Sequence, residues 1–395
     1  MRNKNENKKE SYNTIEEAVL AIFVNKKNRK RMFMVLFLLS IVGAVIILTG
    51  THFLLKQQSI IEQNKDIDWR NEHAILKQLK LSRQGNEESI DYLVNSEMAR
   101  IKTDNIDSKV EMFFVGDLML DRYNRQLIQM HGAEWITKEI NHLFLDNDLN
   151  VVNLEGPITR EKSVSVGSKE GAKNNYVFTF DPKNTNEFLK YNKLNLINLG
   201  NNHVLNFGKD GLDYTKGFLL TKKVEFFGDI KNEGAGYIKK NINGTKVSFV
   251  SYNQFGGNGF DSVLKNIENL EESSDITIVY THWGQEYKLN ENESQKKRAH
   301  NMIDVGADLI IGSHPHVVQS IENYKGKTIF YSLGNFVFDQ YFSKDTMIGL
   351  GVKAFVDKEN DLTFELIPLE LTKGGQMKIS GKEENGLLMK RILKK

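Results

Sequence analysis

Five short apolar stretches of this chain each end at a side chain that could bind a metal ion. The residues at these ends are Asp117, Glu155, Asn202 with His203, His282, and His314 with His316. The stretches are rich in Val, Ile, Leu or Phe and are stopped by Gly, Asn or Pro, which is typical of buried strands. Carboxylate and amide oxygens combined with imidazole nitrogens suit a divalent cation. The pattern predicts one metal site drawn from five parts of the chain.

The elements that must position these residues follow the logic of layered α/β proteins. In such proteins ligands bind outside the carboxyl ends of the strands, so residues far apart in the sequence can meet there. Helical patterns separate the strand-like stretches, at residues 122–130, 133–144, 185–191, 212–221, 262–270 and 295–305. This alternation of strands and helices predicts the α/β fold class.

Two further signals concern the sheets. Asn243-Gly244, between the strand-like residues 237–241 and 246–252, predicts a two-residue hairpin. We expect this hairpin to begin a second sheet that runs antiparallel. Residues 364–371 are predicted to form a late strand, and Pro368 within it indicates the edge of a sheet because proline cannot donate a ladder hydrogen bond.

The order of the motifs resembles that of the calcineurin-like metallophosphoesterases. The residues within these motifs are similar to those of one branch, the CapA/PgsA-type poly-γ-glutamate capsule biosynthesis proteins. The segments that carry the resemblance are FVGDLM (114–119), NLEGP (153–157), NNH (201–203), HWGQEY (282–287), GADLIIG (306–312) and FYSLGNFVFD (330–339). The resemblance covers residues 109 to 340 and implies a four-layer α/β/β/α sandwich.

The same resemblance implies one or two divalent cations, with Mn, Zn and Fe equally compatible. The implied ligands are Asp117 and His316 for the first cation, Glu155 as a bridge, and Asn202, His282 and His314 for the second. Two cations about 3.5–4 Å apart can hold the attacking and leaving oxygens of a phosphoryl transfer. His203 would protonate the leaving group, since an imidazole titrates near neutral pH.

Two residues depart from the phosphoesterase pattern. Its Asp-x-His is Asp117-Leu118-Met119 here, so one histidine ligand of the first cation is absent. Its bridging aspartate is Glu155, which has a longer side chain. Asp121 is a candidate to complete the coordination of the first cation.

Candidate substrate contacts surround this expected centre. Arg122 could bind an anionic substrate through two parallel hydrogen bonds. Glu286 and Asn335 are the other two candidates, although Gly334-Asn335 also fits a tight turn at a strand end. Trp283 and Tyr287 could be either site wall or core, and His131, His142 and His300 are expected to be surface or packing residues.

Several classes of chemistry are excluded by the composition and motifs of the 395 residues. The chain contains no cysteine, so a thiolate nucleophile and a zinc–sulfur site are excluded. It has no complete Gly-x-x-x-x-Gly-Lys-Ser/Thr phosphate loop, so it is not expected to activate glutamate with ATP. It also lacks a Gly-x-Ser-x-Gly elbow and a basic, aromatic-rich patch, so we expect neither a serine hydrolase nor a nucleic-acid partner.

Residues 32–55 form an uncharged apolar run long enough to span a bilayer as a single N-terminal transmembrane helix. A cleavable signal peptide is the alternative, but the run is long for one and no Ala-x-Ala site follows it. Residues 1–31 carry nine Lys/Arg against four acids, which predicts a cytoplasmic N-terminus. The expected organisation is a cytoplasmic basic tail (1–31), the transmembrane helix (32–55), a stalk (56–108), an extracellular domain (109–375) and a basic tail (376–395).

The family resemblance implies a membrane-bound role in making poly-γ-glutamate at the cell surface. The implied partners are an ATP-dependent poly-γ-glutamate ligase, a small membrane subunit of the same complex, and the anionic polymer itself. Two alternatives stay open. The domain could be a metal-dependent phosphodiesterase acting on cell-wall or lipid-linked phosphates, or a structural or export component without turnover.

Overall fold

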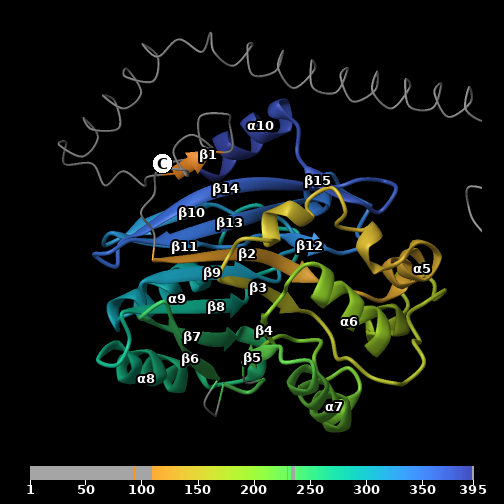
Figure 1. The fold of residues 1–395 in the computed structure, drawn as a ribbon, viewed down its shortest axis with the longest axis horizontal. Coiled ribbons are helices and arrows are strands. Elements are labelled where there is room, and N and C mark those ends of the chain that lie inside the picture. The colour runs from red at the N-terminus through yellow and green to blue at the C-terminus, as the bar shows by residue number, and fades with distance from the viewer. Residues whose placement is uncertain (1–91, 95–108, 229, 233–235, 394–395) are drawn as a thin grey trace, which may run out of the picture. The chain divides into compact units, whose positions relative to one another are not determined.

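Two β-sheets lie face to face at the centre of the domain (Figure 1). The computed structural model describes residues 92–94, 109–228, 230–232 and 236–393. Within these ranges nine strands form the first sheet and six form the second. The mixed α/β class predicted from the sequence is confirmed. The predicted tail at 1–31, the predicted span at 32–55 and most of the predicted stalk lie outside the described residues.

The first sheet carries three of the strand ends that were expected to hold the metal site. Its path runs β1-β14-β13-β2-β3-β4-β5, with β12 beside β2 and β15 beside β14. Strands β2 to β5 are parallel neighbours, so their carboxyl ends share one edge. The bounds are β1 Tyr92–Val94, β2 Val110–Leu118, β3 Leu149–Leu154, β4 Leu196–Asn198, β5 Glu225–Phe227, β12 Asn335–Val337, β13 Ile348–Val356, β14 Leu362–Leu371 and β15 Met377–Ile379.

The second sheet contains the other two strand ends. Its order is β10-β11-β9-β8-β7-β6. The predicted hairpin is confirmed, because β6 and β7 pair antiparallel across Asn243 and Gly244, whose φ angles are 52° and 91°. The bounds are β6 Tyr237–Ile242, β7 Thr245–Asn253, β8 Ile276–His282, β9 Leu309–Ser313, β10 Ile321–Tyr324 and β11 Lys327–Phe330.

The expectation that this second sheet is antiparallel is wrong for its centre. Strands β7, β8, β9 and β11 pair parallel, and the antiparallel pairs lie at the two edges. The reason is the connections: α8 (Phe260–Glu271) follows β7 and α9 (Glu293–Asp304) follows β8. A helical crossover returns the chain to the same end of the sheet, which makes the next strand parallel.

Five of the six predicted helices are present, and one is not. Alongside α8 and α9, the structure has α5 (Arg122–His131), α6 (Pro182–Tyr191) and α7 (Gly208–Thr221). The predicted helix at 133–144 is instead two separate 3₁₀ turns, Ala133–Trp135 and Asn141–Phe144. An α-helix would need the Ile136 carbonyl for the amide of residue 140, but that carbonyl accepts a hydrogen bond from Met377 N (2.6 Å).

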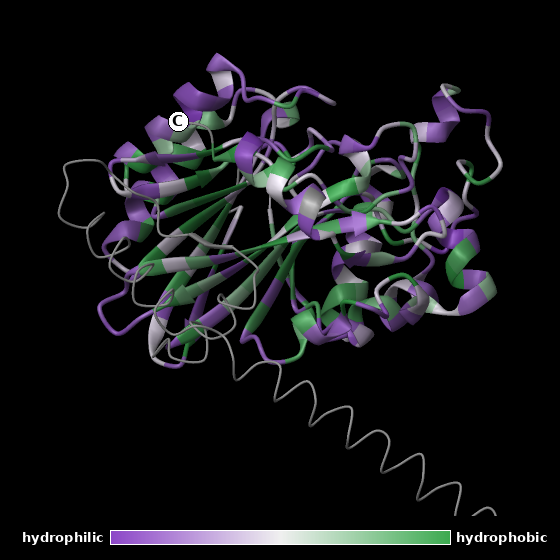
Figure 2. Ribbon diagram, turned by 90° about the horizontal axis from the view of Figure 1, so that it is seen from above, coloured by the Kyte–Doolittle hydropathy of each residue, from purple (hydrophilic) through white to green (hydrophobic). Residues whose placement is uncertain are grey.

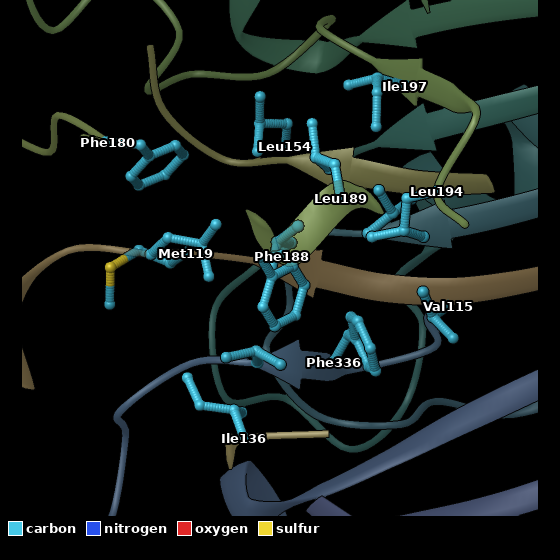
Figure 3. Packing of buried hydrophobic residues seen from close by; sticks show 14 of the residues in the cluster. Val115, Met119, Ile136, Leu154, Phe180, Phe188, Leu189, Leu194, Ile197 and Phe336 are labelled. Carbon is cyan, nitrogen blue, oxygen red and sulfur yellow. The ribbon is translucent and has the colours of Figure 1, made fainter. Parts of the chain in front are cut away.

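Three apolar clusters alternate with the two sheets. The first lies between the first sheet and α5, α6 and α7, and Figure 3 shows part of it around Phe188 and Phe336. The second lies between the sheets, and the third between the second sheet and α8 and α9. Successive residues of β2 alternate between clusters, Phe113 facing the first and Phe114 the second, as the period of a strand requires. The strands in Figure 2 are accordingly mostly hydrophobic.

Both ends of the predicted domain differ from expectation. Residues 376–395 are not simply a basic tail, because β15 and α10 (Lys382–Ile392) occupy most of that range. The buried side chains of Leu388, Met389 and Ile392 join the cluster between the sheets, which the charged residues around them obscure in the sequence. At the other end, β1, within the predicted stalk, pairs with β14.

β14 is not an edge strand, although Pro368 had indicated one. It pairs with β13 along one side and with β1 and β15 along the other. Pro368 falls in the gap between the β1 and β15 segments, where its missing N–H breaks neither of those two ladders. Within the ranges described here, no helix is long and apolar enough to cross a membrane.

Two glycines allow the backbone segments around the strand ends to approach closely. A Cβ at Gly116 would lie 1.9 Å from the carbonyl oxygen of Gly334, and one at Gly312 would lie 2.0 Å from that of Tyr331. Asp117 N donates to the Gly334 carbonyl across the same contact (3.1 Å). Gly116 directly precedes Asp117, and Gly312 lies two residues before His314. These contacts therefore fix the backbone positions from which the two side chains extend.

We expect Gly116→Ala to destabilise the fold by about 2–3 kcal/mol, because the added methyl group overlaps a backbone oxygen. Urea denaturation of the full chain measures the change. The matched control is Gly217→Ala in α7, where an added Cβ meets no atom within 4 Å. That exposed helical site should gain about 0.5–1 kcal/mol. Equal effects of the two substitutions would contradict the proposed close approach.

Candidate metal centre

The strand ends of both sheets bring carboxylates and imidazoles together. Asp117 lies in β2, Glu155 follows β3, and His282 ends β8. His314 and His316 follow β9. The separations are 3.9 Å from Asp117 Oδ1 to His282 Nδ1, 3.5 Å from Asp117 Oδ2 to His316 Nδ1, and 3.6 Å from Glu155 Oε1 to His316 Nε2. All five side chains are buried.

Asp117 is held by donors that favour its ionised form. Its Oδ1 accepts from Asn153 Nδ2 (2.8 Å) and its Oδ2 from the backbone N–H of His314 (3.0 Å). Burial by itself raises the pKa of this carboxyl. The hydrogen bond to His316 and the charges of His282 and His316 outweigh burial and hold the pKa below its usual value. The carboxylate is therefore a fixed negative charge.

Glu155 is in the opposite situation. Within the described part of the chain, neither of its buried carboxyl oxygens has a hydrogen-bond partner. Burial, followed by the negative charge of Asp117, raises its pKa well above the usual value. His314 Nδ1 is likewise buried without a partner among these residues. Such unpartnered groups are costly unless something pairs with them. Divalent cations bound beside Glu155 and beside His314 would pair with these atoms, so the residues fit the metal that the sequence implies.

Hydrogen bonds at the far nitrogen orient two of the histidines. His316 Nδ1 pairs with Asn335 Oδ1 (2.9 Å), which leaves Nε2 on the side of Glu155. His282 Nδ1 pairs with Ser313 Oγ (3.0 Å), while its Nε2 lies 2.8 Å from Asn202 Oδ1. Metal-binding histidines commonly have such a partner on the nitrogen that faces away from the ion.

The loop after β9 is strained where it presents its two imidazoles. His314 and His316 have φ angles of 93° and 58°, values that non-glycine residues rarely adopt. Backbone strain of this kind persists where the surrounding structure enforces it, and it gathers at functional sites. We infer that the loop keeps this strained conformation because it positions the two imidazoles, at a cost to the stability of the loop itself.

Asn335, which was predicted to contact substrate, faces inward instead. β12 pairs with β2 so that Asn335 lies opposite Asp117. Its Nδ2 donates to Gln340 Oε1 (3.0 Å) and to the Thr346 carbonyl (2.9 Å), and its Oδ1 contacts His316. Every polar atom of the side chain is thus used within the protein, and the geometry supports a role in positioning His316.

Asp121 was considered as a replacement for the missing histidine ligand, and this prediction is wrong. Its carboxylate accepts hydrogen bonds from Arg125, Ser163, Ser165 and the backbone of Thr179, at 2.8 to 3.0 Å. Asp121 belongs to neither group of metal-ligating side chains found among the described residues. Met119, at the position of the missing histidine itself, is buried in the first apolar cluster (Figure 3). Its sulfur accepts from Asp121 N (3.1 Å).

Arg122 is already paired. Its Nε lies 2.9 Å from Asp339 Oδ1, and its guanidinium lies over the rings of Phe178 and Phe338. It lines a cleft of about 510 Å³ together with Tyr287. The Tyr287 ring centroid is 6.1 Å from that of His316, so the cleft adjoins the metal centre. Trp283 is core, with Nε1 donating to the Tyr331 carbonyl (2.9 Å), whereas Tyr287 is part of the wall.

His203 lies at the rim of the centre, with Nε2 3.9 Å from Glu155 Oε1. Its Nδ1 pairs with Asn206 Oδ1 (3.1 Å), an oxygen that also accepts from Phe178 N. Nδ1 is therefore the protonated nitrogen, and Nε2 has its lone pair toward the centre. Burial lowers the pKa of His203 to about 4, so the ring is neutral at pH 7. Nε2 is therefore unprotonated at pH 7. His203 must first bind a proton at Nε2 before it can act as the predicted general acid.

Sequence reasoning missed a network of asparagines beneath the centre. Asn153 donates to Asp117, and its Oδ1 accepts from Asn198 Nδ2 (3.0 Å) and Asn201 Nδ2 (3.1 Å). All of these side chains are buried. The available signal was their position: Asn153 and Asn198 lie at the carboxyl ends of β3 and β4, and Asn201 directly precedes the predicted ligand Asn202. Neutral amides at these positions orient the carboxylate without adding a competing charge.

The two-sheet α/β fold fits a metallophosphoesterase-like class, and candidate ligands of a divalent cation lie at the carboxyl ends of strands from both sheets. Residues 111–340 match the family model described as "Bacterial capsule synthesis protein PGA_cap". This chain belongs to that family, as its motifs predicted.

Curated relatives agree with this assignment. The chain is 31% identical over 299 residues to "PGA biosynthesis protein CapA" of Bacillus subtilis (strain 168), covering 70% of this chain and 75% of that protein. It is 26% identical over 312 residues to "Capsule biosynthesis protein CapA" of Bacillus anthracis, covering 73% and 74%. A shorter match, 34% over 79 residues, is to a "Probable polyglutamine synthesis accessory protein" of Mycobacterium tuberculosis, with 20% and 21% covered.

We expect Asn335→Ala to weaken binding of Mn²⁺ by about 10- to 100-fold, the usual cost of removing the partner that orients a ligating histidine. Titration calorimetry of the full chain in detergent measures this affinity. Asn269→Ala, on the exposed face of α8, is the control and should bind as the wild type does. Wild-type affinity in Asn335→Ala would show that His316 needs no such partner.

Proposed function

We propose that this chain is a membrane-anchored subunit of a poly-γ-glutamate capsule synthesis and export complex, and that its metal-centre domain acts outside the cell. Family membership and the names of the two Bacillus relatives support the capsule role. The observation that carries the role of the centre is the Glu155 carboxyl, which has no hydrogen-bond partner among the described residues and lies between His203 and His316 beside the ionised Asp117. A purely structural domain would not need to bury such a group.

The proposed division of labour follows from what the chain contains. It has no complete Gly-x-x-x-x-Gly-Lys-Ser/Thr phosphate loop, so an ATP-dependent ligase in the same complex would make the polymer. A small membrane subunit would complete the complex. The charge asymmetry around residues 32–55 favours a single span with residues 1–31 in the cytoplasm, and thus an extracellular domain that meets the polymer as it emerges.

Within the centre, each residue has a definable task. Asp117, Glu155 and His316 would hold one divalent cation, and Asn202, His282 and His314 would hold a second. A bound cation polarises a carbonyl or phosphoryl oxygen as a Lewis acid. Asn153 keeps Asp117 oriented and ionised, and Asn335 keeps His316 Nε2 pointed inward. The neutral His203 accepts a proton at Nε2 and can return it to a leaving group.

A second candidate function is a phosphodiesterase that acts on cell-wall or lipid-linked phosphates. The observations that favour it are the contact of Asn202 with His282 (2.8 Å) and the position of His203 beside Glu155 (3.9 Å), residues that the metallophosphoesterase pattern assigns to its site. The third possibility, an export component without turnover, is favoured by Met119, which sits in the apolar core where a ligand would be expected.

We expect a full chain carrying His282→Ala and His314→Ala to fail to restore surface polymer in a poly-γ-glutamate-producing Bacillus that lacks its own relative of this protein. The two substitutions remove imidazoles from the centre. Polymer is measured as glutamate released from washed cells. His131→Ala, which changes an exposed residue at the end of α5, is the control. Full restoration by the double variant would leave only the export role without turnover. Hydrolysis of bis(p-nitrophenyl) phosphate by wild type alone would favour the phosphodiesterase.

We expect the domain of the full chain to be cleaved by protease added to intact protoplasts, while a tag at the N-terminus stays protected, because the apolar run would hold residues 1–31 inside. A chain without residues 1–55 should appear in the soluble fraction and restore no surface polymer. Immunoblots against the domain and the tag report both results. A protected domain in intact protoplasts would reverse the proposed orientation.

A further inference from the structure

Glu286 lies on the exposed side of the centre, close to two of its histidines. Its carboxylate and one ring nitrogen each of His314 and His316 lie within 4.8 Å of one another. A second group, formed by Asp117, Glu155 and His316, meets the same criterion on the buried side. His316 thus stands between two sets of metal-ligating atoms, one buried and one open to solvent.

The loop that carries Glu286 is fastened on both sides of this residue. Before it, Trp283 is anchored in the core, and Gly284 N donates to Gln254 Oε1 (2.9 Å). After it, Tyr287 N donates to the carbonyl of Pro315 (2.8 Å), which lies between the two histidines. Gly284 and Tyr287 have φ angles of 90° and 63°, so the loop turns sharply at both points. An exposed carboxylate is therefore held against His314 and His316 by its backbone.

Both histidines have nitrogen atoms to offer. His314 Nδ1 is buried and has no hydrogen-bond partner within the described ranges, and His314 itself is only 4% exposed. In His316 the Asn335 hydrogen bond occupies Nδ1, so Nε2 is the nitrogen left for a ligand. An orphaned buried nitrogen is an observation independent of the carboxylate, and it points to the same missing partner.

Charge supports the same conclusion. Glu286 adds a third carboxylate to a centre that already buries those of Asp117 and Glu155. The nearby cationic side chain of Arg122 is already paired with Asp339. Carboxylates placed this close together repel one another unless a cation lies between them.

We propose that Glu286 is a direct metal ligand that, with His314 and His316, binds a divalent cation at the mouth of the centre. Two imidazoles and one carboxylate form a donor set that suits Zn²⁺, Mn²⁺ or Fe²⁺ and leaves coordination positions open for water or substrate. This inference rests on the proposed metal centre. It adds a ligand that the resemblance did not imply, and it assigns His314 and the one free nitrogen of His316 to a single cation instead of dividing them between two.

The test compares the full-length wild type with Glu286→Gln, both freed of metal with a chelator and kept in detergent. We expect the variant to lose one class of bound Mn²⁺, or to bind it at least about tenfold more weakly, since losing even a residue behind a ligand costs 10–100-fold. Metal content after gel filtration and titration calorimetry give stoichiometry and affinity. Glu293→Gln, an exposed residue at the start of α9, removes the same charge nearby and should bind as the wild type does.

A second measurement separates a ligand from a nearby charge. In the Co²⁺-loaded proteins, loss of a ligand shifts the visible absorption bands in Glu286→Gln. Loss of a nearby charge that is not a ligand, as in Glu293→Gln, leaves the bands in place. Unchanged bands together with unchanged Mn²⁺ affinity would overturn the role of Glu286 while leaving the metal centre intact. A wild type that binds no metal at all would overturn the proposed centre as well.

Discussion

The structure around this centre depends on two buried carboxylates, Asp117 and Glu155, placed on either side of one imidazole. Asp117 is ionised because the hydrogen bond to His316 and the charges of His282 and His316 outweigh its burial. Glu155 has no hydrogen-bond partner within the described part of the chain. Burying a polar group in this state costs free energy that the fold must supply elsewhere. The apolar packing of the three clusters around the two sheets supplies the stability that offsets this cost.

The supporting residues share one chemical strategy. Neutral amides and hydroxyls, rather than charges, orient the ligands: Asn153 holds Asp117, Asn335 holds His316, and Ser313 holds His282. These partners fix direction without competing for the cation. Arg122 is likewise already paired, with Asp339, and it lines the wall of the cleft. A cation or an anionic substrate would thus meet a centre whose internal charges are already arranged.

Much of this protein could be predicted from its sequence, because the signals are local. Short apolar runs stopped by Gly or Asn identify the five strands, and the side chain at each stop identifies the ligand candidates. The Asn243-Gly244 hairpin and five of the helices follow from turn chemistry and apolar periodicity in the same way. The order of the motifs also determined the family, which the match over residues 111–340 bears out.

Only the tertiary structure decided what depends on contacts between distant segments. The turn of chain at 133–144 has helical periodicity, but Met377 takes the Ile136 carbonyl that a helix would need. Asp121 carries the right chemistry for a ligand, but it accepts four hydrogen bonds, three of them from donors at residues 163–179. Asn335 and Glu286 could each have faced a substrate, and strand pairing and loop anchoring turned one inward and the other toward the histidines. Residue type sets what a side chain can do, whereas direction and partners arise from packing.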